Sequence, residues 1–320
     1  MIAGMTIYQI FWYFLIYSFA GWCIEVIFHA ITVGKVINRG FLCGPVCPVY
    51  GFGAISVFAV VDGVLPDIFH YPAEKLTGGD DIIGILIVFV CGVALATAVE
   101  LLAGWLLDVA FHMRWWDYSN EPFNFRGYIC LRFSLIWGLA CLLVVRVVQP
   151  AMANLVLNIP DLIGWIILGV SYVTLLADFV VTVLIVAGLN KKLEELDEVR
   201  RRMSVVSDEL SEKLATGTMR AQTTIEEQRV QATLAKYEAR DAVNKQKKKM
   251  QDKADQTRQR TRELQERAGA LKENIMSGRF FGSRRLLEAF PDMAHRKYSE
   301  ALLAVQRDLQ IKKKDRGGKA

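Results

Sequence analysis

Five apolar stretches follow one another in the first 189 residues, and each is long enough to cross a membrane. They cover residues 7–33, 46–65, 82–112, 128–148 and 162–189. About 20 apolar residues in a helix span the hydrocarbon core of a bilayer, so each stretch predicts one transmembrane helix. The first stretch lacks the basic start and the cleavage site of a secretory signal, and we expect it to remain as a span. The pattern predicts an all-α, polytopic membrane helix bundle with the lipid bilayer as its surroundings.

The pattern changes at residue 190, where charged residues become frequent and apolar residues recur at heptad spacing. Leu196, Val199 and Met203 begin this spacing, and residues 190–276 contain no proline. We therefore divide the chain into a transmembrane domain (1–189), a long helix or coiled coil (190–276), and a short C-terminal helix with a basic tail (277–320).

Composition and charge follow the same division. The whole chain is 53% hydrophobic, with a mean hydropathy of +0.27. Residues 1–189 carry 7 Lys/Arg and 12 Asp/Glu, a net charge of −5, whereas residues 190–320 carry 31 and 21, a net charge of +10. This contrast excludes a single soluble globule, a disulfide-stapled miniprotein and a fully disordered chain.

Lys and Arg in the connecting segments predict the orientation of the bundle. Loop 1, between the first and second spans, carries Lys35 and Arg39, and loop 3, between the third and fourth, carries Arg114 and Arg126. The loop after the second span has only Lys75 among several acids, and the loop after the fourth span has no Lys or Arg. Because Lys and Arg accumulate on the cytoplasmic side, we expect an outside N-terminus and a cytoplasmic tail.

A repeated pattern links the first two spans to the next two. Residues 21–29 (GWCIEVIFH) match residues 104–112 (GWLLDVAFH), and residues 39–43 (RGFLC) match residues 126–130 (RGYIC). The pair Tyr50-Gly51 then corresponds to Trp137-Gly138. We interpret residues of about 8–65 and 90–148 as parallel repeats of one two-helix hairpin, followed by a fifth span. Transporters often place a binding site where such repeats meet.

Ionisable residues within and beside the spans are the candidate functional residues, because burying a charge in hydrocarbon is costly. The repeats duplicate an acid, a histidine and an arginine near one end of the bundle. These residues are Glu25, His29 and Arg39 in the first copy, and Asp108, His112 and Arg126 in the second. Pairs between Glu25 and Arg126 and between Asp108 and Arg39 are possible, as are pairs within each repeat. Such pairs would either lock the hairpins together or take part in transport.

Two further acids lie inside spans. Glu100 is near the middle of the third span, where the first repeat has Tyr17. Its carboxyl group either handles a proton or cation, or is a neutral acid bonded to a tyrosine or serine. Asp178 in the fifth span raises the same question, with Arg132 or Arg146 as a possible partner.

Both loops on the predicted cytoplasmic side have distinctive sequences. Loop 1 reads RGFLCGPVCPVYGFG over 39–53, and this density of Gly and Pro precludes a continuous helix. It predicts either a tight turn into the second span or a re-entrant segment buried in protein. Loop 3 contains aromatic residues that are typical of a membrane interface. The candidate loop residues are Gly44, Pro45, Pro48 and Tyr50 in and after loop 1, and Asp117 and Asn124 in loop 3.

These motifs resemble those of the putative ABC-transporter type IV permease (CmpB-like) family of bacterial membrane proteins. The resemblance covers about residues 8–150, with YSFAGWCIE at 17–25, RGFLCGPVCPVYG at 39–51, and WDYS at 116–119 followed by the segment 124–137. The stretch RRLLEAFPDM at 284–293 is similar to tails in the family. The resemblance implies a transport component of the bacterial cell membrane, and no substrate, cofactor or catalytic residue is carried over.

The absence of several well-known motifs limits the chemistry that this chain could carry out. The sequence has no G-x-x-x-x-G-K-[ST] phosphate-binding loop, so a permease would need a separate ATPase subunit or an ion gradient. It also lacks G-x-S-x-G and H-E-x-x-H, and Cys43 and Cys47 have no matching Cys/His pair downstream. We expect no catalytic site, no metal, no cofactor and no nucleic-acid partner.

Three functions stay open at this point. The first is a permease-like transport component, which would act as a homo-oligomer because five spans make an incomplete path. The second is a membrane-anchored scaffold whose cytoplasmic tail binds a protein partner. The third, with the least support, is a lipid-modifying enzyme that uses the paired acids and histidines.

Overall fold

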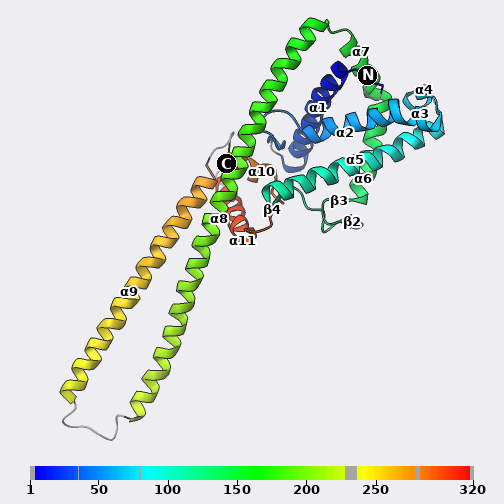
Figure 1. Ribbon diagram of the computed structural model, residues 1–320. Helices are drawn as coiled ribbons and strands as arrows, with labels where there is room; N and C mark the ends of the chain where they lie inside the picture. Colours follow the sequence, from blue (N-terminus) through cyan, green and yellow to red (C-terminus); the bar gives the residue numbers. More distant parts are fainter. Residues whose placement is uncertain (1–3, 35, 79–80, 228–235, 278–281, 318–320) are drawn as a thin grey trace. The chain divides into compact units, whose positions relative to one another are not determined.

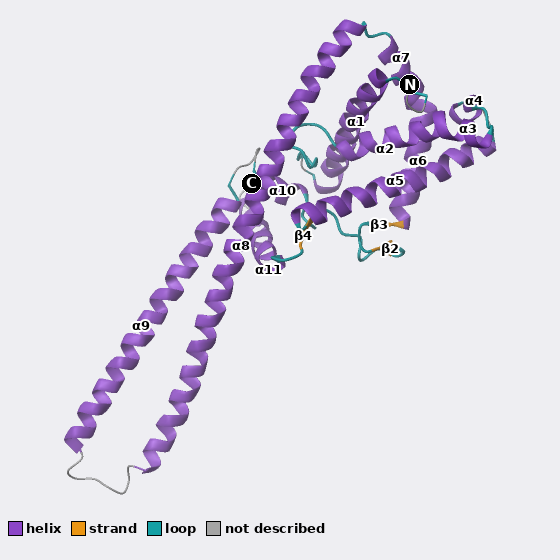
Figure 2. Ribbon diagram, in the orientation of Figure 1, coloured by secondary structure: helices purple, strands orange, loops and turns teal. Residues whose placement is uncertain are grey.

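The computed structural model describes residues 4–34, 36–78, 81–227, 236–277 and 282–317, and its regular structure is almost entirely helical (Figure 2). It divides into two compact units. Unit 1 comprises residues 1–189 and 277–299, and unit 2 comprises residues 190–276 and 300–320. The sequence analysis grouped residues 277–320 as one C-terminal segment. In the structure, residues 277–299 belong to unit 1 and residues 300–320 to unit 2.

Unit 1 is a membrane helix bundle. Its five long apolar helical runs are Ile7–Thr32, Pro48–Asp67, Ile82–Phe111, Leu131–Leu157 and the first part of Asp161–Asp208. Apolar side chains such as Leu162 and Val173 are exposed on the surface, as expected of helices that face lipid. The prediction of a polytopic, all-α membrane bundle with five spans is confirmed.

Most of these runs contain several helices. In chain order the helices of unit 1 are α1 (Ile7–Val33), α2 (Pro48–Phe58), η1 (Ala59–Val64), α3 (Leu65–Phe69), α4 (Ala73–Thr77), α5 (Ile82–Phe111), α6 (Leu131–Leu143), η2 (Val144–Val148), α7 (Gln149–Leu157), the beginning of α8 (Asp161–Glu227), and α10 (Ser283–Ala289). Loop 1 accordingly runs over 34–47 and loop 3 over 112–130.

Prolines explain the two π-helical segments, η1 and η2. Pro66 follows η1 and Pro150 follows η2, each at the start of the next helix. Proline has no backbone N–H, so it cannot donate to the carbonyl group one turn earlier. A wider π turn at such a point lets the helix continue. The second and fourth spans therefore share the same local irregularity.

Glycines allow the helices to approach closely. Helix α1 packs on α2, α5 packs on α6, and α2 packs on α5. A Cβ atom on Gly51 would lie 2.2 Å from the Oγ of Ser18, and one on Gly138 would lie 2.3 Å from a methyl group of Val93. Small residues at such crossings are typical of membrane helix interfaces.

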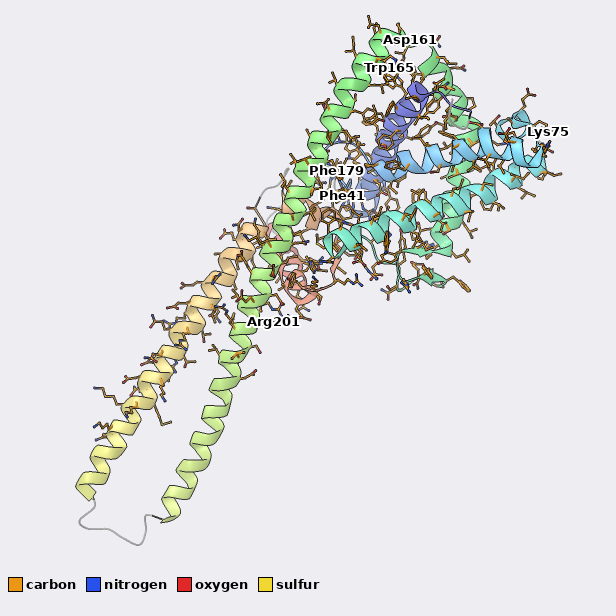
Figure 3. All side chains as sticks on the ribbon, viewed as in Figure 1. Phe41, Lys75, Asp161, Trp165, Phe179 and Arg201 are labelled. Carbon is orange, nitrogen blue, oxygen red and sulfur yellow. The ribbon has the colours of Figure 1, made fainter. Side chains whose placement is uncertain are left out.

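The fifth span packs on the first through aromatic side chains. Trp165 of α8 lies with its ring 5.3 Å from that of Tyr8 and 6.4 Å from that of Phe11, both in α1 (Figure 3). Tyr172 donates a hydrogen bond to the backbone carbonyl of Phe11 at 3.1 Å.

Four short strands form two pairs in unit 1. Strand β1 (Met113–Arg114) is antiparallel to β4 (Ala294–His295), and β2 (Asn124–Phe125) is antiparallel to β3 (Ile129–Cys130). The first pair joins loop 3 to a segment about 180 residues further along the chain. The second pair lies within loop 3 itself.

Unit 2 consists of the remainder of α8, α9 (Lys236–Ile275) and most of α11 (Ser299–Gly317). The remainder of α8 and α9 are two long antiparallel rods (Figure 1). The core lies at one end, where seven aliphatic residues are buried: Leu193, Leu196, Val199, Ile275, Leu302, Val305 and Leu309. Along α9, Ile275 is fully buried whereas Met250 is 58% exposed. A coiled coil along the rest of these rods stays a prediction.

Candidate functional site

The acid of the first repeat is bound within its own hairpin. The Tyr50 hydroxyl donates to Oε1 of Glu25 at 2.7 Å, and Nη1 of Arg39 lies 3.6 Å from Oε2 of the same carboxylate. The ion pairs seen among the described residues do not include Glu25 with Arg126 or Asp108 with Arg39. Of the alternatives open in the sequence, the structure shows the pair within the repeat.

The acid of the second repeat is more deeply buried and has different partners. Asp108 is 1% exposed, and its Oδ2 accepts a hydrogen bond from the Tyr128 hydroxyl at 2.5 Å. The arginine nearest to this oxygen is Arg114, at 3.6 Å, while Arg126 lies over the ring of Phe125. Arg126, which the sequence offered as a partner for Glu25 or Asp108, has a φ of 51° and therefore lies in the left-handed backbone region.

The two repeat-related histidines occupy unlike positions. His29 is buried on α1, at 3% exposure. His112 ends α5 in the left-handed conformation, with a φ of 55°, and its backbone carbonyl accepts a hydrogen bond from the amide of Arg296 at 2.9 Å. His112 thus marks the point where loop 3 begins.

Glu100 is buried in the bundle, and one of its two oxygens accepts a clear hydrogen bond. It is 9% exposed, and its Oε1 accepts a hydrogen bond from the Tyr118 hydroxyl at 3.2 Å. Its other oxygen, Oε2, is buried and makes no hydrogen bond of good geometry among the described residues, although the side chain of Trp137 also interacts with this carboxyl group. Burial and the neighbouring Glu100 carboxylate raise the pKa of Tyr118, so its hydroxyl keeps the proton that it donates. The tyrosine beside Glu100 therefore comes from loop 3.

Asp178 binds backbone amides rather than an arginine. Its two oxygens accept hydrogen bonds from the amides of Cys43 and Gly44, at 3.0 and 2.8 Å, and Thr182 one turn later also accepts from Cys43 at 3.3 Å. Arg132 instead lies 3.7 Å from Glu121, and Arg146 donates to the carbonyl groups of Leu76 and Gly78. The expected partners of Asp178 are corrected, because irregular buried backbone needs acceptors for its own amides.

The carbonyl groups of the same loop are bound by an arginine that the sequence analysis did not select. Arg285 of α10 is 4% exposed and donates to the backbone carbonyls of Gly40 at 2.8 Å, Phe41 at 2.9 Å and Asn38 at 3.3 Å. The only signal in the sequence was that Arg285 precedes two leucines in the stretch RRLLEAFPDM at 284–293. Loop 1 is thus held from two sides, by a carboxylate on its amides and a guanidinium on its carbonyls.

The Gly and Pro residues of loop 1 shape this backbone. The amide after Pro45 returns to the carbonyl of Gly44 at 2.9 Å, and the amide of Cys47 bonds to the carbonyl of Ser18 on α1. Pro48 begins α2, where a missing N–H costs nothing. Burial raises the pKa of the Cys47 thiol to about 12, so this thiol stays protonated.

Side-chain hydrogen bonds hold loop 3. Asp117 accepts from the amide of Ser119 at 3.0 Å. The side chain of Asn124 donates to the carbonyl of Glu121 at 2.8 Å and accepts from the amide of Gly127 at 3.2 Å. Phe41 connects the two loops, since its ring lies 5.2 Å from that of Trp115 (Figure 3).

The chemistry of this region is that of hydrogen-bonded carboxylates. In the part of the chain that the structure describes, no group of three or more His, Cys, Asp or Glu side chains is arranged to hold a metal ion. Glu25, Asp108 and Glu100 each accept a hydrogen bond from a tyrosine hydroxyl. Such groups can take up or release a proton or bind a small cation.

Comparison with known proteins gives one result. A family model described as putative ABC-transporter type IV matches residues 12–183, which is more than half of the chain. This range includes all four membrane acids discussed above and stops short of Arg285. No curated protein and no solved structure matches.

Proposed function

The chain belongs to the putative ABC-transporter type IV family, and from this premise we propose that it is the permease-like, membrane-spanning component of a transport system. It is a multi-pass membrane protein with five apolar helical runs. Energy would come from a separate ATPase subunit or an ion gradient, because the sequence has no nucleotide-binding loop. The proposal assigns transport rather than enzymatic catalysis to this chain.

The buried and incompletely hydrogen-bonded carboxyl group of Glu100 is the observation that carries the proposal. A buried carboxyl oxygen without a hydrogen-bond donor lowers stability, so a purely structural acid would be expected to bind through both oxygens. A proton or cation at Glu100 would give this buried oxygen a partner.

The proposed parallel repeats would place this group at the junction of the two hairpins. Helix α2 packs on α5, and the repeat-related residues Tyr50 and Trp137 contact each other, with ring centroids 5.5 Å apart. Equivalent residues meet in this way beside a two-fold pseudo-axis. The π segments before Pro66 and Pro150 support the same duplication. Parallel repeats related by an axis along the membrane normal occur in known transporters.

The remaining parts of the proposal concern location and assembly. We place the chain in the bacterial cell membrane, as the family resemblance implies. The loop charges favour an N-terminus outside, with loops 1 and 3 and the tail in the cytoplasm. Five spans in each copy favour a homo-oligomer that completes the path.

The test of the proposal is Glu100→Gln in the full-length chain reconstituted into proteoliposomes. The amide keeps the shape of the side chain and cannot exchange a proton or carry a charge. We expect a loss of proton or monovalent-cation flux of at least about tenfold with normal expression, and a smaller loss for Tyr118→Phe. Glu74→Gln, at an exposed acid outside the long spans, is the matched control. Flux equal to wild type in Glu100→Gln would refute Glu100 as the coupling group.

A membrane-anchored scaffold is the second candidate, favoured by the length of unit 2. Helix α8 has 67 residues and α9 has 40, and charged side chains dominate α9. Truncation at residue 190 would also remove Arg285 from loop 1, so the informative variant shortens only the distal parts of both rods, between residues 209 and 250. If the shortened chain no longer binds a protein partner of the tail, and cells carrying it show the phenotype of cells that lack the whole protein, the scaffold is favoured. Normal growth with the shortened rods would eliminate it.

A further inference from the structure

Residues 282–298 lie against both loops at one end of unit 1. In α10, Ser283, Arg285, Leu286 and Leu287 are buried, although this helix has only seven residues. The guanidinium of Arg285 reaches three carbonyl groups of loop 1, and its Nη2 lies 4.0 Å from the Sγ of Cys43. A planar guanidinium matches several carbonyl oxygens at once, which a lysine ammonium on a flexible stem does less well.

The same segment is also bound to loop 3. Strand β4 pairs with β1, with Met113 opposite His295, and the amide of Arg296 donates to the carbonyl of His112 at 2.9 Å. Phe290 packs on Trp115 with ring centroids 5.1 Å apart. The side chain of Arg296 lies 3.9 Å from Oδ1 of Asp108.

The contacts of residues 282–298 with loops 1 and 3 come from short elements, so they can form and break together. The strand pair has two residues on each side, and α10 has fewer than three turns, so neither element is stable by itself. Both ends of the segment continue into unit 2, so a released segment stays tethered. Tethering gives a high effective concentration and makes rebinding fast.

We propose that residues 282–298 form a releasable strap that closes the loop end of the membrane unit, with Arg285 as its latch on loop 1 and β4 as its attachment to loop 3. Release of the strap removes the Arg285 guanidinium from the loop 1 carbonyls and from the half-buried Cys43 thiol, which keeps its contact with the Thr182 hydroxyl. It also separates the only long-range strand pair that the described residues of loop 3 make. Loops 1 and 3 are then free to move with their hairpins. This step rests on the proposed transport function, in which a path opens between the hairpins.

Cys43 is a reporter for this opening. The full-length chain in nanodiscs is exposed to a water-soluble maleimide, and the labelling rate of the peptide that contains Cys43 is followed by mass spectrometry. We expect Arg285→Ala to raise this rate at least about tenfold and Arg285→Lys to give an intermediate rate. Arg284→Ala is the matched control, because Arg284 pairs with Glu288 within α10 and makes no hydrogen bond or ion pair with loop 1 in the described structure.

A disulfide provides the opposite perturbation without removing Arg285. Met113 and His295 are directly opposite in an antiparallel pair, where Cα separations of about 4.5–5.5 Å suit a disulfide. In Met113→Cys/His295→Cys, oxidation should slow the labelling of Cys43 at least about threefold, and reduction should restore it.

Two results would overturn the proposal. One is an Arg285→Ala rate equal to that of Arg284→Ala. The other, which applies even if Arg285→Ala does not fold, is equal Cys43 labelling in the oxidised and reduced forms of the double-cysteine variant.

Discussion

Asp178 offers the sharpest test of how loop 1 is held. The perturbation is Asp178→Ala in the full-length chain, which removes the acceptor of the Cys43 and Gly44 amides and leaves α8 with a good helix former. The two amides are not equally dependent on this residue. The Cys43 amide also has the Thr182 hydroxyl as an acceptor at 3.3 Å, whereas Asp178, at 2.8 Å, is the only acceptor of the Gly44 amide in the described structure.

The size of the effect follows from the charge on the acceptor. A hydrogen bond to a charged group contributes about 1.5–3 kcal/mol, roughly twice the value for a neutral pair. Loss of about 2.7 kcal/mol from the local opening free energy at Gly44 corresponds to about 100-fold faster exchange, since each 1.4 kcal/mol is a factor of ten. Cys43 should be affected less, by about tenfold, because Thr182 remains.

The assay is amide hydrogen exchange with fragmentation that resolves residues 43 and 44. Asp178→Asn, which keeps one acceptor oxygen, should give an intermediate rate. Asp161→Asn is the control, because Asp161 is the exposed first residue of the same helix. If the Gly44 amide exchanges at the wild-type rate in Asp178→Ala, the carboxylate does not stabilise loop 1 and this account of Asp178 is wrong.

Two further predictions concern packing and pH. Gly51→Ala and Gly138→Ala should each lower the free energy of unfolding by about 1–3 kcal/mol, because the added methyl group overpacks a helix contact. Gly53→Ala is the control, since nothing lies within 4 Å of the added Cβ. Thermal unfolding in detergent measures the difference, and melting temperatures equal to that of Gly53→Ala would contradict the prediction. Burial lowers the pKa of His295 to about 4, with His112 and Lys297 adding to the effect and Asp108 opposing it, whereas a released strap has a histidine pKa of about 6.5. The bound strap therefore takes up fewer protons, its binding is strongest above pH 6.5, and it weakens by at most about tenfold per pH unit as the pH falls towards 4. Exchange of the Arg296 amide, corrected for its intrinsic pH dependence, measures this, and a pH dependence that persists unchanged in His295→Asn would exclude His295 as its source.

Local pattern was sufficient for much of the fold. The five spans follow from the length of their apolar stretches, since a helix in lipid satisfies its own backbone and needs no partner to be recognised. The Gly and Pro residues of loop 1 predicted irregular backbone for the same reason, because they restrict the chain where they stand. For Glu100, the sequence suggested a tyrosine or serine as a possible partner, and it did not identify Tyr118 as that residue.

Partners distant in the sequence were beyond such patterns. Asp178 could have paired with either of two arginines by charge alone, and it binds the amides of Cys43 and Gly44 instead. Asp108 lies beside Arg114 and Arg296 rather than the arginine of the repeat motif, since Arg126 lies over the ring of Phe125. Arg285 lies more than 240 residues from its carbonyl acceptors, and its sequence neighbours contain no hint of them.

The sequence by itself thus determined the membrane bundle, the spans and the acids that need an explanation, because hydrophobic length and buried charge are properties of single segments. Only the tertiary structure decided which groups those acids bind and that residues 282–298 close the loops. Each of these contacts depends on distances between segments that are remote in the chain. Such distances are set by the packing of glycine-lined helices and by the need of irregular buried backbone for hydrogen-bond partners.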